Sequence, residues 1–197
     1  MDELIKVLND GITNNTIVDN IDLSYQTMIF KDFSYLISDR LNAYKCDFKA
    51  CIFDKASFKD CCFEEANFEG CYLRNFEMID STFHNANFKD ANLQNSRVVI
   101  SFGDNVCFED TDLSNAKFND VSLSGSSLKN SKLINIEVID SNFRNADFEG
   151  ADLSDARFIN VNFDNARLVD VKIDGTKFEK CTFQGAELDE KLKKILN

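Results

Sequence analysis

Few side chains in this sequence could carry out catalysis or bind a metal. The 197 residues include one histidine, His84, and seven cysteines. A catalytic nucleophile needs a neighbouring base, and a zinc site needs closely spaced Cys or His ligands. His84 lies in a polar stretch that we expect to form a solvated corner, and no Cys-x-x-Cys pair occurs. The sequence therefore predicts no enzyme, no metal site and no cofactor.

The cysteines are better interpreted as small hydrophobic residues. Five of them alternate with alanines at a repeating position, namely Cys46, Cys51, Cys61, Cys71 and Cys181. A buried thiol packs there as a compact apolar group. Their odd number, and an acidic N-terminus, MDELIKVLNDG, that resembles no signal peptide, favour reduced thiols in a cytoplasmic protein. No apolar run is long enough for a membrane span.

A five-residue period dominates the chain. Every position from Phe48 to Leu188 whose number ends in 3 or 8 carries Phe, Leu, Ile, Val or Met, with Gly103 as the one exception. Five residues advance about 500° on an α-helix, so a helix would bury no common face. A continuous strand would place successive centres on opposite faces. The pattern fits three extended residues, two of them pointing inward, followed by two that turn a corner.

A second period of 20 gives the number of sides. Similar residues recur at this spacing, as in Leu73, Leu93, Leu113, Leu133 and Leu153. Charges alternate in sign at the same spacing in Lys49, Glu69, Lys89, Glu109, Lys129 and Glu149. Opposite charges on adjacent strands, about 4.8 Å apart, stabilise a sheet. We therefore expect an all-β solenoid with four sides and 20 residues per coil.

The segments ADFEG, ADLSD, ANFKD and ANLQN follow the pattern A(D/N)LXX. This repeat resembles that of the pentapeptide-repeat proteins, strongly over residues 46–188 and weakly over 16–33. The resemblance implies a right-handed quadrilateral β-helix with a core of stacked Phe and Leu. Its handedness comes from the resemblance alone, because spacing does not determine it.

The ends and two irregular stretches complete the expected organisation. We predict an N-terminal helix and cap over residues 1–20, with the helix at 2–10 and Gly11 as its stop, an irregular first coil over 21–45, the regular repeat over 46–188, and a C-terminal helix over 189–197. The period lapses at Ser38 and Ala43. At Gly103 we expect a local bulge that turns Phe102 inward, in preference to a functional loop.

Two outward columns are candidate partner-binding residues. One is acidic and consists of Asp60, Asp80, Asp120 and Asp140; the other, beside it, is apolar and consists of Ile79, Val99, Ile139 and Ile159. Exposed apolar residues in a row suggest a docking face. They are equally explained by the preference of β-branched residues for extended backbone.

The net charge of −12 makes direct binding of nucleic acid unfavourable. The acidic excess is explained either by solvation or by mimicry of an anionic rod. Resemblance to the quinolone-resistance proteins and their mycobacterial relatives implies a DNA mimic that binds DNA gyrase or topoisomerase IV. The chain has no long loop insertion after residue 46, so it is more similar to the loopless mycobacterial type. The alternative is a structural or protein-interaction scaffold with another cytosolic partner.

The C-terminal segment LDEKLKKILN places Leu192, Ile195 and Leu196 on one helix face. These residues could close the last coil or pair with a second copy. The resemblance implies a homodimer through this helix.

Overall fold

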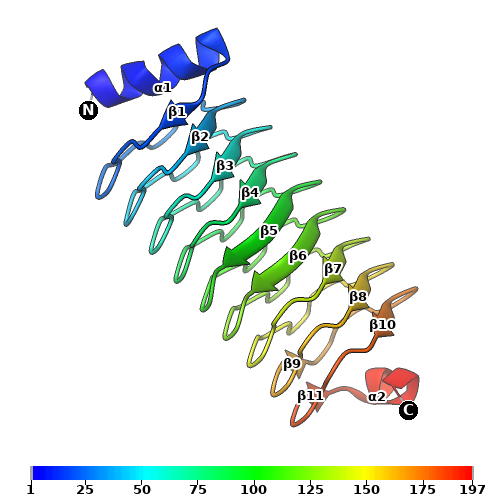
Figure 1. The fold of residues 1–197 in the computed structure, drawn as a ribbon. Helices are drawn as coiled ribbons and strands as arrows, with labels where there is room; N and C mark the ends of the chain where they lie inside the picture. The colour runs from blue at the N-terminus through cyan, green and yellow to red at the C-terminus, as the bar shows by residue number, and fades with distance from the viewer. Residues whose placement is uncertain (1, 197) are drawn as a thin grey trace.

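The computed structural model describes residues 2–196 and shows a four-sided coil with a helix at each end (Figure 1). The helices are α1 (Asp2–Asn14) and α2 (Glu190–Leu196). The strands are β1 (Val18–Asp19), β2 (Ile37–Asp39), β3 (Ser57–Lys59), β4 (Glu77–Ile79), β5 (Arg97–Phe102), β6 (Lys117–Ser122), β7 (Glu137–Ile139), β8 (Arg157–Ile159), β9 (Arg167–Leu168), β10 (Lys177–Glu179) and β11 (Glu187–Leu188).

One side of the coil, the strand face, is a parallel sheet of nine strands in the order β1 to β8 and then β10. These strands lie in a single row along the molecule (Figure 1). Each pairs with the strand 20 residues later, so that Val98 is opposite Phe118 and Phe118 is opposite Val138. Isolated parallel bridges at the same spacing link the other sides, as between Asn67 and Asn87. The predicted four-sided solenoid with 20 residues per coil is confirmed.

The corners explain why Asn, Asp and Gly recur. The second residue after each centre has a positive φ, for example 57° at Asn75 and 66° at Gly70. Asn, Asp and Gly tolerate this left-handed conformation better than other residues. The Asp or Asn just before a centre has a different function, because its side chain accepts a backbone N–H two residues later. Asp47 Oδ1 accepts the Lys49 N–H at 3.1 Å in this way.

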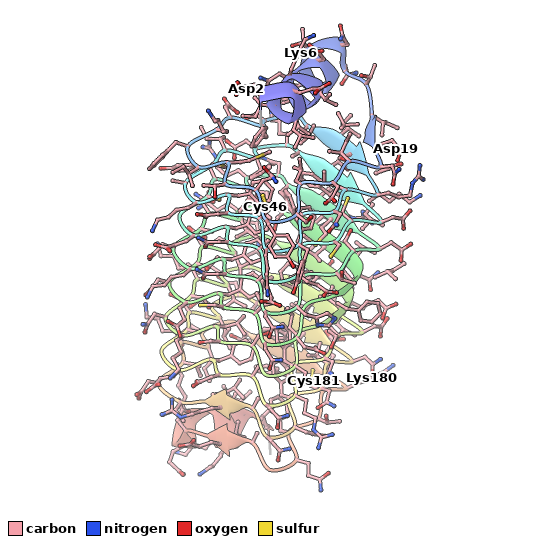
Figure 2. All side chains as sticks on the ribbon, turned by 90° about the vertical axis from the view of Figure 1, so that its left-hand side faces the viewer. Asp2, Lys6, Asp19, Cys46, Lys180 and Cys181 are labelled. Carbon is pink, nitrogen blue, oxygen red and sulfur yellow. The ribbon has the colours of Figure 1, made fainter. Side chains whose placement is uncertain are left out.

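Stacked apolar side chains fill the interior. Phe48, Phe68, Phe88 and Phe108 form a continuous stack with ring centroids 5.1, 4.7 and 5.1 Å apart. All four rings are at most 2% exposed. Polar atoms lie toward the outside of the coil in Figure 2, whereas the labelled Cys46 lies inside. Each added coil therefore buries another layer of apolar surface against its neighbours.

The first coil is regular, which corrects the irregular conformation expected for residues 21–45. Ser38 and Ala43 occupy ordinary centre positions and are fully buried. The large side chains that they lack are supplied two residues earlier by Leu36 and Leu41, which are 1% and 2% exposed. The Ser38 hydroxyl donates to Val18 O at 2.6 Å, so its burial leaves no polar group unsatisfied.

The bulge expected at Gly103 is also wrong. Phe102 is 50% exposed, and β5 stays in register with β6 through the pair Phe102 and Ser122. Phe83, one coil earlier, occupies the space that a side chain at position 103 would need. A Cβ built on Gly103 would lie 2.1 Å from Phe83 Cε2. Glycine at position 103 therefore leaves room for the Phe83 ring of the preceding coil.

Both ends of the coil are covered by helices, as predicted, but α1 continues past Gly11 to Asn14. Gly11 is buried inside the helix because Val18 packs against it, and an added Cβ would lie 2.2 Å from Val18 Cγ2. At the other end, Asp189 caps α2 by accepting the Leu192 N–H at 2.9 Å. No helix within residues 2–196 is long and apolar enough to cross a membrane.

Candidate protein-binding face

His84 and the buried cysteines, the residues considered above for catalysis, take part in hydrogen bonding and packing. His84 lies at a corner, where its Nδ1 accepts the Asp104 N–H at 3.0 Å. Burial raises the pKa of the Cys46 and Cys61 thiols to about 12 and that of Cys51 to about 11. A thiol that keeps its proton is a poor nucleophile. Among residues 2–196 no group of three or more His, Cys, Asp or Glu side chains could hold a metal ion.

The acidic column lies along one edge of the strand face. Asp60, Asp80, Asp120 and Asp140 are corner residues with φ values of 54°, 53°, 57° and 50°. All are exposed. Successive coils are about 4.8 Å apart, so the structure brings these carboxylates into one row. Their left-handed backbone provides a conformational reason for Asp at these positions, in addition to any role in binding.

These four carboxylates have no basic partner among the described residues, a property that they share with other exposed corner acids such as Asp90 and Asp170. Elsewhere acids and bases alternate as expected, with Lys49 Nζ 2.8 Å from Glu69 and Lys129 Nζ 3.1 Å from Glu149. Asp140 accepts only the side-chain amide of Asn160, at 2.7 Å. The edge of the strand face therefore carries negative charge that the chain itself does not neutralise.

The apolar column lies immediately inside this edge. Register pairs place Ile79 beside Val99, and Ile139 beside Ile159, with Asn119 between the two pairs. Val99 is 8% exposed, and the three isoleucines are partly buried by their neighbours. The sequence-predicted apolar and acidic residues thus form one continuous surface.

Two further residues of this surface were missed. Ile100 replaces an acid in the acidic column, has a φ of 49° and is 44% exposed. A left-handed conformation is strained for a β-branched residue, and such strain often marks functional sites. Phe102 lies just past this corner, on the adjacent side of the coil, and is 50% exposed. The signal in the sequence was an Ile in a column otherwise filled mainly by Asp, Asn and basic residues.

The opposite edge of the strand face carries a charged column of Ser57, Glu77, Arg97, Lys117, Glu137, Arg157 and Lys177. Arg97 Nη1 lies 2.6 Å from Glu77, and Arg157 Nη1 lies 3.8 Å from Glu137. Arg97 and Lys117 are direct neighbours of like charge, an unfavourable arrangement in a sheet.

The three residues expected to form a dimer differ in their exposure to solvent. Leu192 is fully buried against the last coil, so it acts as a cap. Leu196 is partly buried and packs against the same core. Ile195 is 51% exposed and is the one of the three that is free to contact another molecule.

Comparison with known proteins agrees with this architecture. The family model for the pentapeptide repeat region matches residues 103–178, and the model for eight pentapeptide repeats matches residues 41–70 and 61–98. No curated protein matches the chain. Similar solved structures include QnrB1 (R167E, trypsin-treated), a plasmid-mediated fluoroquinolone resistance protein, with 17% identity, a TM-score of 0.49 and coverage of 91% of this chain and 95% of that one. HetL from the cyanobacterium Nostoc, involved in heterocyst differentiation regulation, has 15% identity, a TM-score of 0.38 and coverage of 96% and 97%.

Proposed function

Because the chain belongs to the pentapeptide-repeat family and forms its right-handed quadrilateral β-helix, we propose that it is a non-enzymatic protein that binds another protein in the cytoplasm. The binding surface is the edge of the strand face formed by the acidic and apolar columns. A rigid coil of this kind presents its outward residues at a fixed spacing.

The observation that carries this proposal is the pairing of unneutralised carboxylates with exposed apolar groups. Asp80 and Asp120 flank Ile100, and Phe102 lies beside them. Apolar and aromatic side chains supply most of the binding energy at protein interfaces, whereas charges at their rim steer association. The complementary partner therefore presents basic side chains around an apolar centre.

For the identity of the partner we propose a type II topoisomerase, DNA gyrase or topoisomerase IV, whose DNA-binding surface has the required positive charge. The acidic column would occupy sites that normally meet phosphates, and a functional consequence would be quinolone resistance. DNA carries one charge per about 1.7 Å of its axis, whereas the column offers at most one carboxylate per coil of about 4.8 Å, and none at Ile100. The apolar residues must therefore contribute affinity that a DNA segment obtains from charge.

A supercoiling assay with purified gyrase, with and without a quinolone, tests the topoisomerase proposal. We expect inhibition or drug protection by the full chain, loss of either effect in the variants D80K and I139D, and no loss in E109K. Glu109 is a matched control because it lies in the alternating charge column and pairs with Lys89 at 3.8 Å. Absence of any effect, and of a complex at low salt, would rule out gyrase.

The broader proposal is tested separately by capturing partners from the native cytosol with the full chain and with the same three variants. Partners lost from D80K and I139D but kept by E109K would support the face. Equal capture by all of them would reject it, and would favour the alternative of a scaffold that uses another surface.

A further inference from the structure

We propose that the strand face also binds a second copy of the chain, in an antiparallel dimer whose two-fold axis crosses the coil at β6. The face is largely self-complementary about that coil in charge and apolarity, with Lys117, Asp120 and the meeting of Ile100 with Asp140 as exceptions. This inference does not depend on the identity of any partner, because it rests on the residues of the face alone.

The symmetry fixes which residues meet. A two-fold axis that lies between the two faces, perpendicular to the rods, keeps each column opposite the same column of the other copy. It also reverses the order of the coils, so the coil before β6 meets the coil after it. Such an interface is isologous: if one residue contacts a second, the second contacts the first across the axis.

The charged column becomes complementary under this operation. Glu77 of β4 faces Arg157 of β8, and Arg97 of β5 faces Glu137 of β7. The ion pairs within each chain, Glu77 with Arg97 and Glu137 with Arg157, would join across the interface into networks of alternating charge. Opposite charges also meet in the outer coils of the other two columns, where Lys59 of β3 faces Glu179 of β10 and Asp60 faces Lys180. In Figure 2, Asp19 and Lys180, near the two ends of the acidic edge of the strand face, lie on the same side of the coil.

The apolar column is complementary as well. Ile79 faces Ile159, and Asn119 faces its own copy on the axis. Val99 faces Ile139 but adds little surface, because it is 8% exposed. The side-chain amide of Asn119 in each copy can donate and accept hydrogen bonds, so this polar pair can be satisfied across the axis. Apolar residues therefore meet apolar residues on both sides of a single central polar pair.

The expected dimer is of modest affinity. The face is narrow, and its nine strands span about 40 Å at a spacing of about 4.8 Å. Lys117 and Asp120 each face their own copy at the axis, which opposes association. The dimer covers both columns assigned to a partner, so a partner and a second copy would compete for the face.

Sedimentation of the full chain and of two charge-reversal variants tests the dimer. E77R and R157E each place like charges opposite each other twice, and each should weaken self-association at least about tenfold. An equimolar mixture of the two variants restores opposite charges at both positions. We expect it to form a heterodimer that neither variant forms alone.

Two controls separate this interface from others. E109K makes the same change of net charge as E77R, but on another side of the coil. I195E removes the exposed apolar residue of α2. Both variants should dimerise as the native chain does. Circular dichroism of every variant verifies the fold. The proposal would be overturned if the native chain stays monomeric at low salt or if the equimolar mixture stays monomeric. It would also be overturned if E109K weakens self-association as much as E77R does, or if I195E abolishes the dimer. Partner capture is a separate measurement, and its outcome does not decide whether the dimer forms.

Discussion

At the scale of the residue, backbone conformation determines much of the surface composition. Corner positions require a positive φ, and most of them carry Asn, Asp or Gly. The same residue types also produce the acidic edge of the strand face. The repeated turn geometry and the acidic edge are therefore two consequences of one requirement, and Ile100 departs from both.

We predict that replacing Ile100 with Asn stabilises the fold while weakening binding. Asn tolerates the left-handed φ of 49°, so the free energy of unfolding should rise by about 1 kcal/mol. Urea unfolding measures the first effect, and partner capture measures the second. Asp120→Asn is the control, because both residues suit the corner and stability should stay constant. An unchanged or lower stability of the Ile100 variant would show that its backbone is not strained.

The buried thiols predict a loss of stability at high pH. Burial raises the pKa of Cys46 from 9.0 to about 12, so the folded chain keeps a proton that the unfolded chain releases above pH 9. This contribution is complete below pH 9 and is lost as pH rises through the folded pKa, by up to about 1.4 kcal/mol per pH unit for each thiol. Urea unfolding between pH 8 and pH 11 should show a smaller decline for Cys46→Ala than for the native chain. A parallel decline in both would contradict the assignment.

At the scale of the element, the four corners of a coil are not equivalent. In most coils three of them close with a backbone hydrogen bond, such as that from the Cys51 N–H to Phe48 O at 3.0 Å. At several coils, the corner after the strand face instead uses a side chain of the next coil. The Cys61 N–H donates to Ser81 Oγ at 3.0 Å, and the Ser81 N–H donates to Ser101 Oγ at 3.2 Å. These buried hydroxyls satisfy donors that the corner leaves unpaired.

Replacing Ser81 with Ala should therefore cost about 1–3 kcal/mol, because the Cys61 N–H loses its acceptor. Ser96 is the matched control: its Oγ is buried and has no hydrogen-bond partner. Ser96→Ala should be neutral or stabilising. Urea unfolding of both variants decides the question, and equal destabilisation would mean that the hydroxyl of Ser81 contributes only volume.

Strict periodicity made the elements predictable, and the failures share one cause. The period identified the coil, the number of sides and the register, because each centre meets its equivalent in the next coil. The period describes each centre separately, so it does not reveal exchanges of volume between positions. Leu36 fills space beside Ser38, Phe83 fills space at Gly103, and Val18 requires Gly11 inside α1. The strain at Ile100 was likewise hidden, because a single sequence does not reveal φ without the turn geometry.

At the scale of the whole molecule, the coils form a one-dimensional array in which each contacts mainly its neighbours. Deleting residues 121–140 joins Asp120 to Ser141 and keeps every later residue on its own side. We expect a folded, cooperative protein whose urea m-value is lower by roughly one tenth, since m follows the surface exposed on unfolding. Deleting residues 121–138 breaks the five-residue phase and should abolish folding. Circular dichroism and urea unfolding compare them, and similar behaviour of the two deletions would contradict independent coils.

The direction of the hydrogen bonds between coils has a mechanical consequence. The chain enters at one end of the rod and leaves at the other (Figure 1), and the ladder bonds, such as the one from the Phe68 N–H to Asn87 O at 2.6 Å, run from coil to coil along that line. A force applied to the two termini would load these bonds in tension, a coil at a time, instead of shearing a whole sheet at once. Each released coil of 20 residues would lengthen the chain by about 70 Å. Stretched between two anchored ends, the protein would yield in small, equal steps at low force.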